Sequence, residues 1–194
     1  MNFDAAYYRR YYEDPRTRVI EPDAVARTVD FLCAYLAYLE VEVRSIVDLG
    51  CGTGAFRAPF AARLPEAVYE GVEASGYACE RFGWTHASAD RFRPAYRYDL
   101  VVCYDVLQYL DDRAADQAID NFAALTSGAL FFGVLTRSDW DPACDRTRTD
   151  GDVYLREGDW YRTRLAPHFR NLGGGIFLPR DSGVIAYDLE TLPE

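Results

Sequence analysis

The sequence predicts an α/β fold in which a doubly wound, mostly parallel sheet has an antiparallel last strand. Short apolar runs recur along the chain, and segments of helical length separate the first four of them. The last two runs are instead joined by a connection of hairpin length. The chain has 194 residues, 49% of them hydrophobic, which is enough for one such core and short for two. We therefore predict a single domain.

The first part of the chain, residues 1–40, is predicted to be helical. It begins with tyrosines that would share one side of a helix, Tyr7, Tyr8, Tyr11 and Tyr12. Pro15 should end that helix. A second helical stretch follows Pro22 and carries an apolar stripe suited to a sheet face, at Val25, Val29, Leu32, Leu36 and Leu39.

The apolar runs after residue 40 give the predicted strands. Those that alternate with helical segments cover residues 45–49, 67–72, 98–104 and 129–135, and a short strand is expected around 84–86. The runs 175–178 and 184–189 have only residues 179–183 between them, which predicts a terminal hairpin. His168 is expected on a helix with Trp160, ahead of that hairpin.

Charge and cysteine content narrow the classes of function. The net charge of −10 would repel a phosphate backbone, so a nucleic-acid partner is not expected. All 21 basic residues are arginines, which removes lysine chemistry from consideration. The five cysteines form no Cys-x-x-Cys pair, and the amino terminus has no secretory signal. No apolar run reaches about 18 residues, so we expect a cytoplasmic protein without a membrane anchor.

A glycine-rich bend follows the first predicted strand. Residues 47–54 read Val-Asp-Leu-Gly-Cys-Gly-Thr-Gly, where a strand should turn into a helix. An ordinary turn between strand and helix would have this composition, and Gly50, Gly52 and Ala55 also satisfy the dinucleotide-binding pattern. A dinucleotide brings an anionic pyrophosphate, whereas S-adenosylmethionine brings a sulfonium and an ammonium. Asp48 would repel the first ligand and attract the second.

Three further elements follow at spacings that suit a nucleoside site. Glu73 ends the next run, about 20 residues beyond Gly50, where an acid can bind both ribose hydroxyls. Asp90 follows Ala89 and could accept a hydrogen bond from an adenine amino group, or simply cap a turn. Residues 98–110 form a buried strand whose end faces the same crevice.

Together these four elements resemble the class I S-adenosylmethionine-dependent methyltransferases, and the resemblance covers residues 40–135. It implies a Rossmann-like, seven-stranded sheet, a donor lying across residues 50–54 and a methyl group directed at the end of the fourth strand. The implied donor-binding residues are Asp48, Gly50, Cys51, Gly52, Gly54, Glu73, Ala74, Ala89, Asp90 and Tyr104. The chain then divides into a helical lid or cap at 1–40, a cofactor-binding core at 41–135, and a substrate-side insert with the terminal hairpin at 136–194.

The sequence departs from the family at the place where a base would stand. Many members that act on small molecules have a histidine in the turn after the fourth strand, and this chain has Gln108-Tyr109 instead. It also has no Asn-Pro-Pro-Tyr tetrapeptide at residues 103–106. Methyl transfer depends mainly on alignment, so a base is optional. Candidate bases are Tyr104, Asp105, Tyr8 and Tyr11, each of which could serve packing or capping alone.

We therefore expect methyl transfer from S-adenosylmethionine to an O, N or C atom of a small molecule, with S-adenosylhomocysteine as product. The alternatives are an NAD(P)-dependent oxidoreductase and a non-catalytic partner protein that binds S-adenosylmethionine. Aminopropyl transfer is less favoured, because few acids surround residues 104–110. No metal site is expected, because the acids are scattered. In the insert, nearby acids nearly cancel the arginines, which favours salt bridges over a carboxylate clamp. We expect a monomer or a homodimer.

Overall fold

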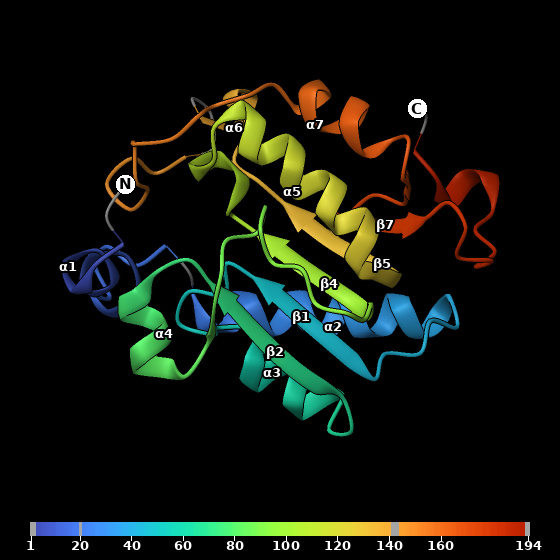
Figure 1. Cartoon of the computed structure of the whole chain (residues 1–194), viewed down its shortest axis with the longest axis horizontal. Helices are drawn as coiled ribbons and strands as arrows, with labels where there is room; N and C mark the ends of the chain where they lie inside the picture. The colour runs from blue at the N-terminus through green and yellow to red at the C-terminus, as the bar shows by residue number, and fades with distance from the viewer. Residues whose placement is uncertain (1–2, 20, 141–143, 193–194) are drawn as a thin grey trace.

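The sheet has seven strands in the order β3-β2-β1-β4-β5-β7-β6 (Figure 1). In this computed structural model, residues 3–19, 21–140 and 144–192 are described. The strands are β1 Ser45–Leu49, β2 Val68–Glu73, β3 Thr85–His86, β4 Tyr98–Tyr104, β5 Thr126–Gly133, β6 Phe169–Asn171 and β7 Ile176–Pro179.

Strand direction confirms the predicted fold class. Neighbouring strands from β3 to β5 run parallel, and β7 is antiparallel to both β5 and β6. The order of the strands reverses between β1 and β4. Open α/β sheets bind ligands at the carboxyl ends of their strands beside such a reversal.

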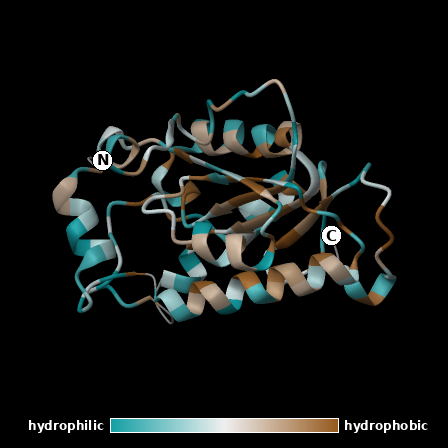
Figure 2. Cartoon of the chain, turned by 90° about the horizontal axis from the view of Figure 1, so that it is seen from below, coloured by the Kyte–Doolittle hydropathy of each residue, from teal (hydrophilic) through white to brown (hydrophobic). Residues whose placement is uncertain are grey.

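Helices cover both faces of the sheet. The helical elements are α1 Ala5–Tyr8, a π-helical turn Arg9–Glu13, α2 Pro22–Tyr38, α3 Arg57–Arg63, α4 Gly76–Phe82, α5 Asp112–Leu125, α6 Arg137–Trp140, α7 Gly158–Leu165, and short 3₁₀ turns at Leu107–Tyr109 and Asp188–Glu190. Helices α2 and α3 pack on one face, and α5 and α7 pack on the other. Figure 2 shows the hydrophobic strands in the middle with helices on both sides. No helix within the described ranges is long and apolar enough to cross a membrane.

Strand β4 shows why the apolar runs in the sequence are continuous and do not alternate with polar residues. Leu100 and Val102 pack in the layer with α2 and α3, whereas Val101 and Cys103 pack in the layer with α5 and α7. Successive side chains point to opposite faces, and both faces of this sheet are covered, so all four of these positions are apolar.

The predicted terminal hairpin is wrong. The structure pairs residues 175–178 with an earlier segment, because β7 forms its hairpin with β6 and not with residues 184–189. In the latter segment Ile185 is 76% exposed and Leu189 is 98% exposed, and although Val184 and Ala186 pack against the core, the segment forms no strand. Strand β6 has three residues, of which only Phe169 is buried, too short a pattern to stand out in the sequence.

The predicted position of His168 on a helix is also wrong. Helix α7 ends at Leu165, and His168 lies in the turn that leads into β6. Its backbone N–H donates to the carbonyl of Leu165. That turn reverses the chain so that β6 can reach the edge of the sheet.

Arg156, in the insert, forms hydrogen bonds with the loop after β4 and an ion pair with the first residue of α5. Its side chain is buried, and it donates hydrogen bonds to the carbonyl oxygens of Leu107 and Leu110. It also forms an ion pair with Asp112 at 2.8 Å, and its guanidinium lies 4.8 Å from the ring centre of Trp160. One buried cation therefore holds the turn that follows the fourth strand.

We predict that Arg156→Met lowers the free energy of unfolding by about 3 kcal/mol, because it removes the ion pair and the carbonyl hydrogen bonds of a buried guanidinium. Urea denaturation measures the change. Arg162→Met is the matched control, because Arg162 is exposed and pairs only with Asp159 within its own helix. The control should change stability by less than about 0.5 kcal/mol. Equal losses in the two variants would contradict the role assigned to Arg156.

Candidate functional site

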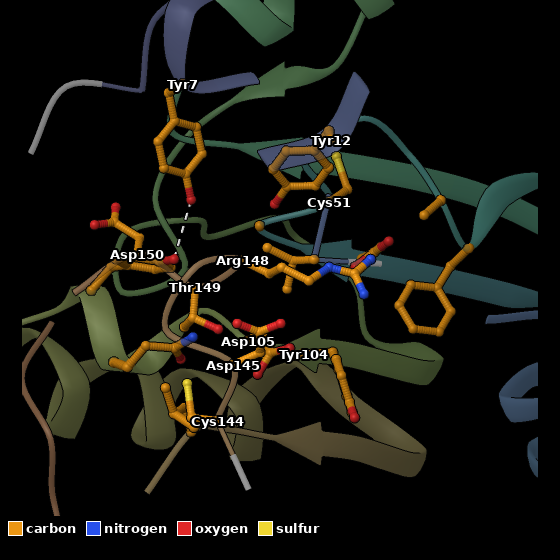
Figure 3. Close-up of a pocket in the computed structure, with 18 residues that line it drawn as sticks. Tyr7, Tyr12, Cys51, Tyr104, Asp105, Cys144, Asp145, Arg148, Thr149 and Asp150 are labelled. Carbon is orange, nitrogen blue, oxygen red and sulfur yellow. Dashed lines mark hydrogen bonds between the residues drawn. The ribbon is translucent and has the colours of Figure 1, made fainter. Parts of the chain in front are cut away.

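A cavity of about 300 Å³ lies at the carboxyl ends of β1 and β4, where the strand order reverses (Figure 3). Four parts of the chain that are distant in sequence meet there: the N-terminal tyrosines, the loop after β1, the loop after β4, and the insert after β5. Its lining includes Tyr7, Tyr12, Asp48, Gly50, Cys51, Phe56, Tyr104, Asp105, Gln108, Tyr109, Cys144, Asp145, Arg148, Thr149 and Asp150.

The N–H groups of the glycine bend donate hydrogen bonds to other groups within the protein. The N–H groups of Gly50 and Cys51 both donate to the carbonyl of Val72, and Gly52 N–H donates to Glu73 Oε2 at 2.8 Å. Gly50 has φ 76° and Gly52 has φ 55°, a left-handed backbone that favours glycine. Because these three donors are already engaged, the bend is poorly suited to bind an anion.

Asp48 lies at the end of β1 beneath the cavity. Its side chain is 2% exposed, and Oδ2 accepts a hydrogen bond from the Tyr69 hydroxyl. Burial, together with the nearby charge of Glu73, raises the pKa of Asp48 to about 7, although the hydrogen bond from Tyr69 opposes this shift. A positive ligand above this carboxyl would stabilise its ionised form.

Glu73 ends β2 on the other side of the bend. Its carboxylate is 6% exposed, and its second oxygen, Oε1, accepts from Ser75 N–H at 2.9 Å. Glu73 and Ala74 line a smaller cavity of about 80 Å³ together with Ala89 and Tyr8. The structure therefore brings these predicted donor-binding residues to one place.

Three predicted donor-binding residues, Gly52, Gly54 and Asp90, line neither of these cavities. Asp90 is buried, and its nearest charged partner is Arg91 at 3.4 Å. Gly54 turns toward a neighbouring ring, because a Cβ there would lie 2.5 Å from Trp84. The loop that carries Asp90 is fixed by Asn121, whose Nδ2 donates to the carbonyl of Ala89 at 2.7 Å.

The N-terminal tyrosines cover the bend. Tyr12 packs on Gly52 so closely that a Cβ there would lie 3.2 Å from the ring. The Tyr7 hydroxyl donates to the Tyr109 hydroxyl at 3.1 Å, which is the dashed line in Figure 3. Tyr11, a predicted candidate base, is buried but lines neither cavity. Tyr7 and Tyr12 reach the larger cavity instead.

The end of β4 places the other two candidate bases at the cavity. Tyr104 is 41% exposed, and its ring stacks on Phe131 with the ring centres 5.3 Å apart. Asp105 has φ 58°, a conformation that costs a residue other than glycine about 1 to 3 kcal/mol. Its N–H donates to the carbonyl of Gly133, and burial raises the pKa of its carboxyl to about 6.

The predicted site residues did not include those that the turn after β4 and the insert contribute, although Arg148 was among the arginines considered for a carboxylate clamp. Gln108 is 3% exposed and lines the larger cavity, as do Arg148, Thr149 and Asp150. The polar Gln108 within an apolar segment was the one available signal. The resemblance placed the insert on the substrate side, but the insert has no periodic pattern that would indicate which of its residues line the cavity.

Salt bridges engage arginines of the insert, as predicted. Arg148 forms an ion pair with Glu21 at 2.6 Å and donates to the carbonyl of Arg18 at 2.9 Å. Arg137 pairs with Glu157 at 3.5 Å. Within the described ranges, no group of three or more His, Cys, Asp and Glu side chains is arranged to hold a metal ion.

Comparison with known proteins gives a family match over most of the chain. A family model described as "Methyltransferase domain" matches residues 8–179. A trans-aconitate 2-methyltransferase of Azoarcus sp. (strain BH72) is 32% identical over 150 residues, which cover 68% of this chain and 59% of the relative. The match therefore spans about three fifths of that relative's length.

Solved methyltransferase structures share the fold. The sugar N-methyltransferase KedS8 from Streptoalloteichus sp. ATCC 53650 superposes with a TM-score of 0.67 at 15% identity, covering 91% of this chain and 92% of KedS8. The N-methyltransferase NodS from Bradyrhizobium japonicum WM9, solved with S-adenosyl-L-homocysteine, gives a TM-score of 0.64 at 20% identity, covering 93% of this chain and 100% of NodS. At these identities the likeness establishes the Rossmann-like methyltransferase fold.

Asp48→Asn should stabilise the protein in a pH-dependent way. Because the pKa of Asp48 is raised on folding to about 7, its unfavourable contribution is absent below about pH 4, grows as pH rises, and is complete above pH 7. We expect the variant to equal the parent near pH 4 and to exceed it by at most about 4 kcal/mol at pH 8. Denaturant unfolding across this range measures the difference, and a difference that stays constant with pH would contradict the assignment.

Proposed function

The chain belongs to the family defined by this methyltransferase domain, and we propose that it transfers a methyl group from S-adenosylmethionine to a small organic molecule. The observation that best supports this proposal is the glycine bend. The N–H groups of residues 50–52 donate to other groups of the protein, and acidic side chains surround the bend. Such a site suits a positively charged nucleoside without phosphate.

The chain's residues fit the parts of the donor in a consistent way. Asp48 presents its carboxyl to the larger cavity, where the sulfonium and the ammonium of the donor would lie. Glu73 and Ala89 line the adjoining smaller cavity, where ribose and adenine would lie. We assign the donor site to the predicted set Asp48, Gly50, Cys51, Gly52, Gly54, Glu73, Ala74, Ala89, Asp90 and Tyr104.

S-adenosylmethionine supplies a methyl group on a positively charged sulfur. The chain has to hold the acceptor atom in line with that methyl group and keep water away, which is where most of the acceleration comes from. Tyr104 and Asp105 stand at the end of β4, on the wall between the donor side and the rest of the cavity. We assign them to positioning the acceptor and, where a proton must leave, to receiving it.

The N-terminal segment, residues 1–40, is assigned the role of a lid. The ring of Tyr12 lies directly on Gly52, and Tyr8 lies beside Glu73 in the smaller cavity. A ligand that lies across the bend needs this space. Donor entry therefore requires the tyrosine rings to withdraw, after which they can pack over the bound nucleoside.

Size and charge support a small-molecule acceptor. A cavity of about 300 Å³ is at the lower end of the range for small-ligand sites. The net charge of −10 disfavours nucleic acid. The similar trans-aconitate 2-methyltransferase and sugar N-methyltransferase KedS8 also carry small-molecule names.

The NAD(P)-dependent alternative is disfavoured by the same bend. A pyrophosphate needs free N–H donors or cations, and the donors of Gly50, Cys51 and Gly52 are engaged. A non-catalytic protein that binds the donor would share the bend and Glu73, and only turnover with an acceptor separates it from an enzyme.

Glu73→Ala should weaken binding of S-adenosylhomocysteine by about 2 kcal/mol or more, roughly thirtyfold, through loss of charge-assisted hydrogen bonds to ribose. Isothermal calorimetry measures the affinity. Glu73→Gln should lose less, because it keeps one acceptor oxygen. Glu66→Ala is the control, because Glu66 is exposed at the opposite end of β2. Unchanged affinity in a folded Glu73→Ala protein would remove Glu73 from the donor site.

Thermal unfolding with two ligands separates the donor from a dinucleotide. A saturating ligand of the native state raises the midpoint by roughly 5 to 10 °C for a chain of this length. We expect S-adenosylhomocysteine to raise the midpoint and NADH to leave it unchanged at the same concentration. A shift with NADH alone would replace the methyltransferase proposal with the oxidoreductase.

A further inference from the structure

We propose that the methyl acceptor is an amine, bound in the larger cavity by acidic side chains and by the amide oxygen of Gln108. This inference rests on the proposed function and names its substrate class. The cavity offers negative charge and hydrogen-bond acceptors, whereas its cationic group is already paired. A ligand that brings positive charge and N–H donors is the chemical complement of that lining.

The charges around the cavity are predominantly negative. Carboxyls line it from three elements: Asp48 from the end of β1, Asp105 from the end of β4, and Asp145 and Asp150 from the insert (Figure 3). Among the described residues of the lining, Arg148 is the one cation.

Arg148 is already paired with groups that do not line the cavity. One of its terminal nitrogens lies 2.6 Å from Glu21 Oε1, and its Nε donates to the carbonyl of Arg18 at 2.9 Å. Both contacts lead to the N-terminal segment rather than into the cavity. The guanidinium therefore ties the insert to the lid, and Glu21 compensates the positive charge that a carboxylate substrate would otherwise meet.

Asp105 is the carboxyl best placed to meet an ammonium. No hydrogen bond or ion pair to its carboxylate is formed by the rest of the described chain, although its N–H is held by the carbonyl of Gly133. Its left-handed backbone is a conformation that the surrounding structure must enforce. A strained residue with an unpaired carboxyl at the mouth of the donor site points to a ligand that supplies the partner.

Gln108 gives an independent indication that a hydrogen-bond donor is missing from the cavity. Its side chain lines the cavity, is 3% exposed, and its Oε1 has no hydrogen-bond partner among the described residues. A buried acceptor without a donor costs about 1 to 3 kcal/mol. The backbone of Gln108 is fixed, because its carbonyl accepts from Tyr154 N–H at 2.7 Å. An ammonium or amine N–H would satisfy Oε1, whereas a carboxylate would place two acceptors together.

The same residues account for the proton that amine methylation releases. A bound ammonium first passes one proton to the Asp105 carboxylate, which frees the nitrogen lone pair. That pair forms the new bond to the methyl carbon while the methyl–sulfur bond breaks and its electrons stay on sulfur. The products are the methylated ammonium and S-adenosylhomocysteine, and Asp105 later returns its proton to water. Burial, which raises the pKa of Asp105 to about 6, makes this carboxylate a better acceptor than an ordinary aspartate.

Matched sets of compounds test the acceptor class. Each set holds an amine, an alcohol and a carboxylate on one carbon skeleton, such as glucosamine, glucose and glucuronate, or 2-phenylethylamine, 2-phenylethanol and phenylacetate, and trans-aconitate is added alone. Calorimetry measures binding of each compound to the protein saturated with S-adenosylhomocysteine, and release of S-adenosylhomocysteine from the methyl donor measures turnover.

We expect the amine to bind at least about tenfold more tightly than its carboxylate partner, and turnover to follow the amines. Stronger binding or faster turnover of the carboxylates, the alcohols or trans-aconitate would overturn the amine inference and leave the methyltransferase proposal standing. Amines that bind no better than their partners in any set would overturn it too. A protein that fails to bind S-adenosylhomocysteine at all would instead overturn the proposed function.

Variants assign the effect to the named residues. Asp105→Asn should lower amine affinity about tenfold, and Gln108→Leu should lower it severalfold. Gln108→Glu has nearly the same shape and should act in the opposite direction, strengthening the amine and weakening the carboxylate. Asp181→Asn, an exposed carboxylate outside the cavity, is the control and should leave both affinities unchanged. If the preference for amines is the same in all folded variants, neither residue recognises the acceptor.

Discussion

The hydrogen bond from Gly52 N–H to Glu73 is the contact on which the site depends. It joins the bend after β1 to the end of β2, and so fixes two neighbouring strand ends relative to each other. It also turns an N–H inward that would otherwise face the cavity. The bend is thereby changed from an anion-binding loop, which this fold can form, into a neutral surface beside carboxylates. Together with the N–H groups of Gly50 and Cys51, which donate to the carbonyl of Val72, this contact supports the proposed choice of a cationic donor.

The ionised carboxyl groups around this bend destabilise the folded protein while the cavity holds no positive charge. Asp48 and Asp105 both have raised pKa values, because burial disfavours their ionised forms and Glu73 adds a like charge beside Asp48. A cationic ligand reverses both effects. Part of the free energy of donor binding would therefore come from relief of strain that the folded protein already carries, and an ammonium at Asp105 would gain from the same source.

The sequence predicted the centre of the fold better than its edges. Strands β1, β4 and β5 are buried over most of their length and β2 over its last three residues, so these strands were found. The family match confirms the resemblance that their loops suggested. Strand β6 lies at an edge with one buried residue, whereas residues 184–189 are apolar yet exposed. The predicted positions of Asp48 and Glu73 follow from strand ends. The positions of Gln108 and Arg148 depend on how a turn and the insert fold back. The local sequence pattern carries no information about this.

Arg148 makes the lid and the acceptor wall a single unit. It lies on the insert that lines the larger cavity, and it holds Glu21 and the carbonyl of Arg18 in the segment that continues from the tyrosine cluster. If Tyr12 must move away from Gly52 for the donor to enter, the segment that moves is the one that Arg148 holds by its ion pair and hydrogen bond. Opening the donor site would therefore loosen the acceptor wall, and closure over the donor would rebuild it. The acceptor cavity is then complete only after the donor is in place, which favours binding of the donor first.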